Sequence, residues 1–262
     1  MHNFDFVKPA TIADAVKALS AEGAQALSGG QTLTPTLKQR LAAPTTLVSL
    51  TGIAEMKGVC MGDDGLSIGA ATTHATVAKE AAAHYPALAA LAGGIGDPAV
   101  RNRGTIGGSI ANNDPAACYP SAVLGSGATV VTNRRKIAAD DYFQGLFTTA
   151  LEEGEIVTGV TFPIPEKAAY VKFNQPASRF ALTGVFVAKF KDGVRVAVTG
   201  ASNDGVFRWS DAEKALSSNF AASAVEGLTV SPDGLIGDLH GTPAYRANLI
   251  KVLTKRAVAA AH

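Results

Sequence analysis

The sequence predicts a protein of the α+β class, with a two-lobed α/β region over residues 1–165 and a small α+β domain over residues 166–262. In the first region, strand and helix patterns alternate along the chain, an order that presents loops for ligand binding at the end of a sheet. In the second region, strand patterns come first and helix patterns follow, which is typical of the α+β class. Pro163-Ile164-Pro165 interrupts regular structure and marks the boundary.

The first lobe is expected over residues 1–55. Thr11 precedes a helical pattern and is suited to cap it, because its hydroxyl can accept a hydrogen bond from the first turn. Thr34 followed by Pro35 has the same character at the start of a second helix. The expected strands cover residues 4–7, 24–27 and 46–50, and the second helix covers residues 35–41.

The second lobe is expected over residues 56–165. Its alanine-rich stretch after Thr72-Thr73-His74 predicts a helix that ends near Gly93-Gly94. His74 could contact a ligand, but a histidine beside a helix start is more often a structural residue. The expected strands cover residues 66–70, 128–132 and 156–162.

The C-terminal domain is expected to contain a three-stranded antiparallel sheet. Lys191-Asp192-Gly193 predicts a tight hairpin turn between the second and third strands. Thr242-Pro243 predicts the start of the last helix. The strands are expected over residues 170–173, 183–190 and 194–201, and the helices over residues 210–216 and 245–259.

Composition excludes several classes of function. The 262 residues are 47% hydrophobic and 17% charged, with a net charge of +1, so no basic field is present to bind nucleic acid or an anionic membrane. No secretory signal and no run of about 20 apolar residues is found, and we therefore expect a cytoplasmic protein without a transmembrane segment. Only Cys60 and Cys118 are present, and no histidines are paired at metal-ligand spacing, so we expect no metal site and no iron–sulfur cluster on this chain.

Residues 101–120 contain the segment that we interpret as the functional site. At its centre is Thr105-Ile106-Gly107-Gly108-Ser109. Two successive glycines can adopt backbone angles barred to other residues, so their N–H groups can converge on one anion with no Cβ in the way. The segment therefore suits an elongated ligand with a phosphate group. Small polar side chains that could add hydrogen bonds are Thr105, Ser109, Asn112 and Asn113.

A second pair, Gly29-Gly30, lies between a strand pattern and a helix pattern near the N-terminus. A helix start carries unpaired N–H groups and the positive end of the helix dipole, so this loop also favours a negative charge. Alone, a Gly-Gly pair between apolar residues is better explained as a tight bend in a sheet protein. Two such loops together favour a diphosphate.

Three passages carry a resemblance to a known family: SGGQTL at 28–33, DPAVRNRGTIGGS at 97–109, and a weaker passage over 172–181. In this order and at this spacing they closely resemble the FAD-binding medium subunit of the molybdenum hydroxylases. That family contains carbon monoxide dehydrogenase, xanthine dehydrogenase and bacterial aldehyde oxidoreductases, and the resemblance covers nearly the whole chain. It implies a two-lobed FAD-binding domain of the vanillyl-alcohol-oxidase (PCMH) type, followed by the small C-terminal domain of these flavoproteins.

The resemblance also implies which residues contact FAD. The two glycine loops would hold the diphosphate, Ile95 would lie against the cofactor, and Val157 would offer backbone groups to the pyrimidine edge of the flavin. Lys172 would lie near the flavin ring. Cys118 stands where relatives often have an acidic residue near the adenosine part, and a thiol is the weaker hydrogen-bonding group. The full set is Ser28, Gly29, Gly30, Gln31, Thr32, Leu33, Ile95, Thr105, Ile106, Gly107, Gly108, Ser109, Asn112, Asp114, Cys118, Val157 and Lys172.

In the family, a molybdenum–pterin centre in a large subunit oxidises the substrate, and [2Fe–2S] clusters in a small subunit carry the electrons onward. The resemblance implies that this chain receives those electrons on FAD and passes them to NAD, oxygen or a quinone. We therefore expect a small and a large partner subunit, arranged as a dimer of heterotrimers. Because a flavin supplies its own redox chemistry, no catalytic residue is expected on this chain.

Two other functions remain open at this point. A self-contained FAD-dependent oxidase or reductase could have the same fold, although few residues follow the boundary to form a substrate domain. A non-redox subunit could use the same loops to hold a nucleotide as a scaffold. A Rossmann-type dinucleotide site is set aside, because no Gly-x-Gly-x-x-Gly follows a strand.

Overall fold

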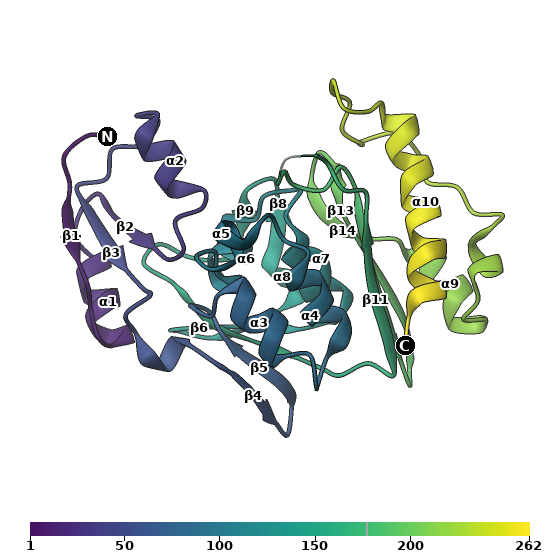
Figure 1. The fold of residues 1–262 in the computed structure, drawn as a ribbon, viewed down its shortest axis with the longest axis horizontal. Coiled ribbons are helices and arrows are strands. Elements are labelled where there is room, and N and C mark those ends of the chain that lie inside the picture. The colour runs from purple at the N-terminus through teal and green to yellow at the C-terminus, as the bar shows by residue number, and fades with distance from the viewer. Residues whose placement is uncertain (177) are drawn as a thin grey trace.

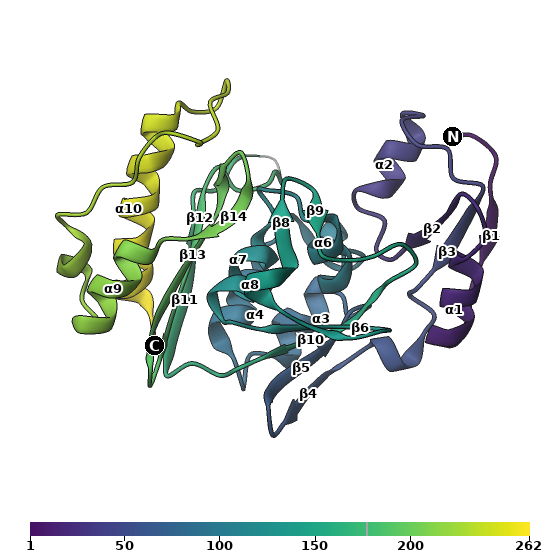
Figure 2. The ribbon, with the colours of Figure 1, turned by 180° about the vertical axis from the view of Figure 1, so that it is seen from behind.

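Three larger β-sheets follow one another along the molecule, with helices between and outside them (Figure 1). The computed structural model describes residues 1–176 and 178–262. A three-stranded sheet lies at the N-terminal end, a five-stranded sheet in the middle, and a four-stranded sheet toward the C-terminal end. The view from behind shows the N-terminal sheet and α10 (Pro243–Ala260) at opposite ends (Figure 2).

The N-terminal sheet has three parallel strands in the order β1 (Asp5–Val7), β3 (Thr46–Ser49) and β2 (Ala24–Leu27). These confirm the three predicted strands. Parallel strands need a crossover connection, and α1 (Ile12–Leu19) supplies it between β1 and β2. The predicted cap of this helix is also confirmed, because Thr11 Oγ1 accepts a hydrogen bond from the backbone N–H of Asp14 at 3.1 Å.

The second predicted helix begins earlier than expected. α2 (Leu33–Lys38) follows Thr32, and Thr34 lies inside the helix, because its N–H donates to the carbonyl oxygen of Gly30 at 3.0 Å. The prediction of Thr34 as the N-cap is therefore wrong. Gly30 has a φ of +71°, which favours glycine, and this turn brings its carbonyl into helical register. Thr32 occupies the cap position without a side-chain hydrogen bond to the helix.

The middle sheet is antiparallel and contains the three strands that were predicted for the second lobe. Two further strands lie at its edges, so that the order is β4, β5, β10, β6, β7. The short pair β8 and β9 stands apart from this sheet. The bounds are β4 (Val59–Gly62), β5 (Gly65–Gly69), β6 (Thr129–Thr132), β7 (Lys136–Ala138), β8 (Phe143–Gly145), β9 (Thr148–Thr149) and β10 (Val157–Phe162).

Short helices lie beside the middle sheet and face the C-terminal sheet (Figure 1). The single alanine-rich helix that we predicted is wrong, because Pro86 starts a second helix. Proline disfavours the helical conformation in the residue before it, and Tyr85 has φ −144° and ψ 77°. The helices of this layer are α3 (His74–Glu80), α4 (Pro86–Gly93), α5 (Pro98–Arg101), α6 (Ile106–Asn112), α7 (Cys118–Gly125) and α8 (Ala139–Tyr142), and the 3-10 turn η1 (Ala54–Met56) precedes them.

The C-terminal sheet has four antiparallel strands, one more than predicted: β11 (Lys167–Lys172), β12 (Gly184–Phe190), β13 (Gly193–Ser202) and β14 (Gly205–Arg208). The prediction missed β14 because this strand follows a turn directly and its four residues contain no long apolar run. The predicted hairpin is confirmed, since Phe190 pairs with Gly193 across Lys191 and Asp192.

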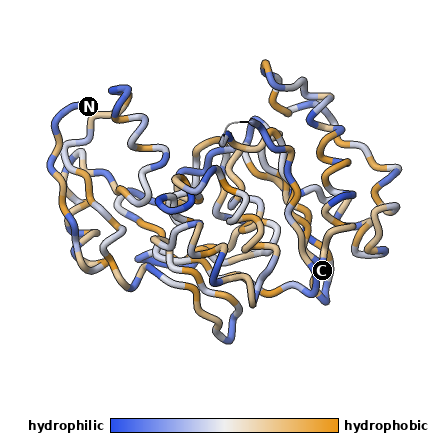
Figure 3. Tube along the Cα trace, viewed as in Figure 1, coloured by the Kyte–Doolittle hydropathy of each residue, from blue (hydrophilic) through white to orange (hydrophobic). Residues whose placement is uncertain are grey.

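Strand β12 shows how this sheet joins the rest of the molecule. Successive side chains of a strand point to opposite faces. Phe186 and Ala188 belong to the core of the middle region, whereas Val185 and Val187 belong to a second core with α9 (Ser210–Ser218), η2 (Ala222–Val225) and α10. Figure 3 shows many hydrophobic residues along the chain in the C-terminal part of the molecule. The main core therefore extends across the expected boundary at residue 165.

A substitution at Leu253 on α10 tests the second core. Leu253 is 1% exposed, whereas Leu239 is 90% exposed. We expect Leu253→Ala to lower the free energy of unfolding by about 2–5 kcal/mol, through lost apolar burial and the cavity left behind. Leu239→Ala removes the same atoms and should change it by less than about 0.5 kcal/mol. Urea unfolding followed by circular dichroism measures both changes, and equal effects would contradict this description of the core.

Candidate functional site

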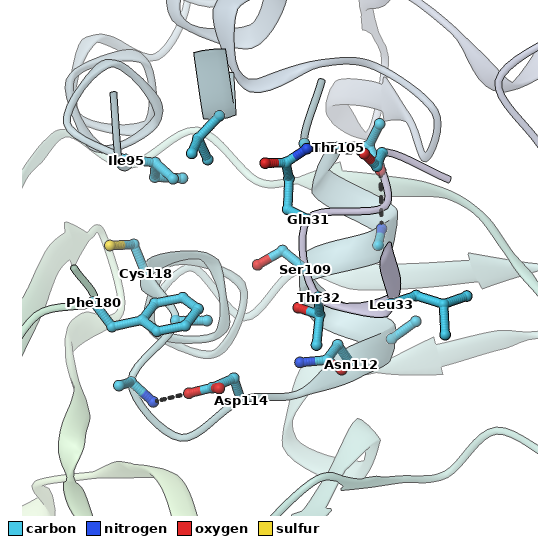
Figure 4. Close-up of a pocket in the computed structure, with 18 of the residues that line it drawn as sticks. Gln31, Thr32, Leu33, Ile95, Thr105, Ser109, Asn112, Asp114, Cys118 and Phe180 are labelled. Atoms are coloured by element: carbon cyan, nitrogen blue, oxygen red, sulfur yellow. Dashed lines mark hydrogen bonds between the residues drawn. The ribbon is translucent and has the colours of Figure 1, made fainter. Parts of the chain in front are cut away.

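A cavity of about 1020 Å³ opens between the N-terminal sheet, the helical layer and the C-terminal sheet. Its walls come from the loop after β2, the first turns of α6 and α7, the start of β10 and the end of β11. Figure 4 shows part of this lining. The volume is at the upper end of the usual range for small-molecule and cofactor sites.

The cavity brings together predicted site residues from distant parts of the sequence. Ile106 is the exception, because its side chain is fully buried in the core and does not line the cavity. The predicted residues that do line it are Ser28, Gly29, Gly30, Gln31, Thr32, Leu33, Ile95, Thr105, Gly107, Gly108, Ser109, Asn112, Asp114, Cys118, Val157 and Lys172.

Gly29 allows the two predicted glycine segments to touch each other. A Cβ at Gly29 would overlap the carbonyl oxygen of Arg103 and lie 2.6 Å from the Cα of Gly104. Beside this contact, the hydroxyls of Ser28 and Thr105 are hydrogen-bonded at 2.8 Å. The obstacle to a side chain at position 29 is backbone, which cannot move aside as the end of a side chain can. The two segments therefore form one continuous wall of the cavity.

The loop after β2 has the features of an anion site. In the described part of the chain, the backbone N–H groups of Gly29, Gly30, Gln31 and Thr32 donate no hydrogen bond to other groups of the protein. Successive unpaired N–H groups of this kind can converge on a negatively charged group. All four residues line the cavity. We expect it to face a negatively charged part of a ligand.

The second motif is the first turn of α6, and our explanation of its two glycines is wrong. Neither Gly107 nor Gly108 has a positive φ. The N–H of Gly107 donates to the carbonyl oxygen of Ala70 at 2.9 Å, and the N–H of Gly108 donates to Thr105 Oγ1 at 3.2 Å. These N–H groups are already paired and do not converge on an anion. Glycine is needed for space instead, because a Cβ at Gly107 would lie 2.5 Å from that of Ala70.

Figure 4 shows polar side chains near the middle of the view, with Leu33 to their right and Asp114 below Phe180. The polar group consists of Gln31, Thr32, Ser109 and Asn112. Ile95, Cys118 and Phe180 lie together on the other side of the view. This arrangement suits an elongated ligand with a polar centre and an apolar end.

Lys172 adds a positive charge at the apolar end. Its Nζ donates to the carbonyl oxygen of Gly94, at the end of α4, at 2.6 Å, and to Cys118 Sγ at 3.6 Å. Cys118 is buried and begins α7. Cys118 and Lys172 therefore lie at the same part of the cavity, although the resemblance assigns them to different parts of FAD. Asp114 also lines the cavity, where it accepts a hydrogen bond from the N–H of Ala116 at 2.9 Å, and burial raises the pKa of its carboxyl group.

The structure adds cavity residues that we did not predict. Phe180 is 51% exposed at the rim, and its ring points into the cavity (Figure 4). The passage that resembles the known family runs through this residue, so the sequence did carry a signal for it. Arg246 on α10 also lines the cavity and is bound by both carboxylate oxygens of Asp238 at 2.8 Å. The sequence around Arg246 does not indicate a site residue, because its position in the cavity depends on how α10 packs.

Asn113 is a structural residue and not the ligand contact that we considered. Its side chain is buried, and its Nδ2 donates to the carbonyl oxygens of Gly145 at 2.9 Å and Thr148 at 2.8 Å. With a φ of 44° it ends α6 in the left-handed conformation, which asparagine tolerates better than most residues. These contacts hold the turn between β8 and β9 against α6.

His74 is buried where it meets the cavity wall. Burial, together with the charge of Arg101, lowers the pKa of His74 to about 4, so the ring is neutral at pH 7. The ring lies 5.3 Å from the ring of Tyr119, centroid to centroid, and its Nδ1 has no hydrogen-bond partner among the described residues. This environment fits a structural role for His74, which we considered more frequent than a ligand contact.

Among residues 1–176 and 178–262, no helix combines the length and the apolar character needed to cross a membrane. The same residues contain no group of three or more His, Cys, Asp or Glu side chains that could hold a metal ion.

Comparison with known proteins identifies the family. The family model described as the FAD-binding domain in molybdopterin dehydrogenase matches residues 2–165, and the chain belongs to this family. It is 34% identical over 271 residues to the nicotine 6-hydroxylase medium subunit of Paenarthrobacter nicotinovorans, covering 97% of this chain and 95% of that protein. It is 31% identical over 275 residues to the carbon monoxide dehydrogenase medium chain of Afipia carboxidovorans, covering 98% and 96%.

The fold gives the same result. The crystal structure of quinoline 2-oxidoreductase from Pseudomonas putida 86 matches with a TM-score of 0.88 at 28% identity, covering 98% of this chain and 96% of that chain. The resemblance to FAD-binding medium subunits of molybdenum hydroxylases is therefore confirmed over nearly the whole length.

His74 should make the protein less stable in acid. Its folded-state pKa of about 4 lies below the ordinary value of 6.5, so the unfolded chain binds a proton first as the pH falls. The loss occurs between these two pH values and amounts to about 3 kcal/mol for a shift of this size.

His74→Phe keeps a ring beside Tyr119 and removes the titrating group, so its stability should depend less on pH in this range. His84→Phe, at an exposed position, is the control and should behave like the parent protein. Urea unfolding at neutral pH and near pH 4 measures the difference. The same pH dependence in His74→Phe and the parent would show that His74 does not titrate as described.

Proposed function

We propose that this chain binds FAD in the cavity and passes electrons from the [2Fe–2S] clusters of a small partner subunit to an external acceptor. The observation that carries the proposal is the order of groups along the cavity wall. Unpaired N–H groups and polar side chains line one part of the cavity, and Ile95, Phe180 and Lys172 line another, in a chain of an FAD-binding family. FAD has parts of matching character: a diphosphate, a polar ribityl chain and a flat ring.

The residues of the cavity fit the parts of FAD. The N–H groups of residues 29–32 would bind the diphosphate, and Ser109 and Asn112 would donate hydrogen bonds beside it. The ring would lie at the end with Ile95 and Phe180, and Val157 would offer backbone groups to its edge. When bound, the flavin supplies the electron-transfer chemistry, while these residues fix its orientation and its potential.

We also propose that residues 1–165 form the FAD-binding domain and that residues 166–262 complete the site. The family model that matches the chain ends at the proposed boundary, which supports this division. The second part contributes lining residues that include Lys172, Phe180 and Arg246. The C-terminal domain is thus proposed to close one end of the cavity.

The relatives suggest the partners. Their names identify them as the medium subunit of nicotine 6-hydroxylase and the medium chain of carbon monoxide dehydrogenase. This chain has only two cysteines, too few for a cluster of its own, so the clusters and the molybdenum–pterin cofactor are proposed to lie on a small and a large subunit. A dimer of heterotrimers in the cytoplasm, with NAD, oxygen or a quinone as acceptor, remains our prediction.

Gly108→Val should remove FAD without unfolding the chain. Gly108 faces the cavity, and a Cβ there would lie 3.0 Å from Thr105 Oγ1 and 3.7 Å from the Cβ of Ser28, so the valine methyl groups would occupy ligand space. We expect FAD to bind at least about tenfold more weakly, a loss of about 1.4 kcal/mol.

Gly227→Val is the matched control, because a Cβ at Gly227 meets no atom within 4 Å. Visible flavin absorbance per chain measures FAD retention, and circular dichroism checks the fold. Full FAD content in a folded Gly108→Val protein would contradict our assignment of the diphosphate site.

Purification of the tagged chain from its native host separates this function from the alternatives. We expect a yellow complex with a cysteine-rich small chain and a large chain, in which substrate reduces the iron–sulfur clusters and then bleaches the flavin. A yellow chain that oxidises a substrate without partners would support the self-contained oxidase. A colourless chain would support the scaffold.

A further inference from the structure

We infer that Lys172, with Cys118 as its side-chain partner, raises the reduction potential of the FAD in the cavity, because no carboxylate cancels the lysine charge there. The inference rests on the proposed function, since it concerns the flavin that the cavity is proposed to hold. It assigns Lys172 and Cys118 a role in setting how readily the flavin accepts electrons.

The contacts of Lys172 carry the argument. Its ammonium group donates to a backbone carbonyl at 2.6 Å and to Cys118 Sγ at 3.6 Å. Within the described residues, no ion pair includes Lys172. The neighbouring Tyr170 does not supply a negative charge either, because burial raises the pKa of its hydroxyl well above the usual range. The groups that orient the lysine are thus a carbonyl oxygen and a sulfur atom, and not a carboxylate.

Two of the three acidic residues that line the cavity are paired with arginines. Glu155 pairs with Arg135 at 3.0 Å, and Asp238 pairs with Arg246 at 2.8 Å. The third acidic residue, Asp114, accepts a backbone hydrogen bond and lies in none of the described ion pairs. Among the described residues, none of these three carboxylates is therefore ion-paired with Lys172.

The other cations of the lining do not have the same effect. Arg246 is compensated by Asp238, with which it forms two hydrogen bonds. Arg179 is exposed, so water and salt screen its charge. Lys172 is partly buried beside Cys118. Of these three cations, Lys172 is the one that is partly buried and has no ion-pair partner among the described residues.

Reduction adds electrons, and hence negative charge, to a flavin. A fixed positive charge nearby favours the reduced form, and the effect is larger inside a protein than in water because the effective dielectric constant is lower. A carboxylate at position 118 would lie within reach of Lys172 Nζ and form an ion pair that cancels most of this field. The side chain at position 118 therefore controls the electrostatic effect of Lys172.

The test is the midpoint potential of the bound flavin, measured by reductive titration of the full chain as purified with its FAD and partner subunits. Cys118→Asp should lower the reduced-to-oxidised ratio at a fixed potential at least about tenfold, which corresponds to about 30 mV for a two-electron couple. Cys118→Ser adds no charge and should leave the potential unchanged. Cys60→Asp makes the same exchange at an exposed cysteine on β4 and is the matched control.

Lys172→Met provides a second measurement if Cys118→Asp does not fold, and it should lower the potential in the same direction. An unchanged potential in either variant with FAD bound would overturn the inference. A shift in Cys118→Ser as large as that in Cys118→Asp would also overturn it, because charge would then not be the cause. Failure of the proposed function would be seen separately, as chains that carry no flavin at all.

Discussion

The site depends on one close contact, in which the backbone of Gly29 lies against the backbone of Arg103 and Gly104. This contact joins the loop of the N-terminal sheet to the helix start at the edge of the middle region. Any side chain at position 29 would force the two segments to move apart. The unpaired N–H groups would then no longer lie beside Ser109, and the polar wall would be split in two.

Local rules explain what could be predicted from the sequence. Thr11 and Thr242 cap their helices as expected, since a hydroxyl and an N–H three residues later are brought together by the chain itself. Strands such as β10 and β12 were found because each is rich in valine and phenylalanine. The residues of the site were found mainly through their resemblance to a family, and the structure places all but Ile106 on the cavity wall.

Long-range contacts explain what could not be predicted. Gly107 is needed because Ala70 lies against it, and its N–H donates to the carbonyl oxygen of Ala70, a residue remote in sequence. Asn113 looks like a ligand contact in the sequence, but the turn between β8 and β9 occupies its side chain. Arg246 reaches the cavity only because α10 packs on the C-terminal sheet. In each case a segment that is distant in sequence determines what the residue does.

The C-terminal sheet has a double role that follows from the alternation in β12. One face completes the main core and the other builds a second core with α10, so the sheet is fixed relative to the helical layer. The end of β11 then places Lys172 against Gly94 and Cys118, which belong to that layer. A ligand that contacts both regions binds best when they are packed together, and its binding free energy adds to the stability of that packing. Cofactor binding and the packing of the two regions are therefore thermodynamically linked.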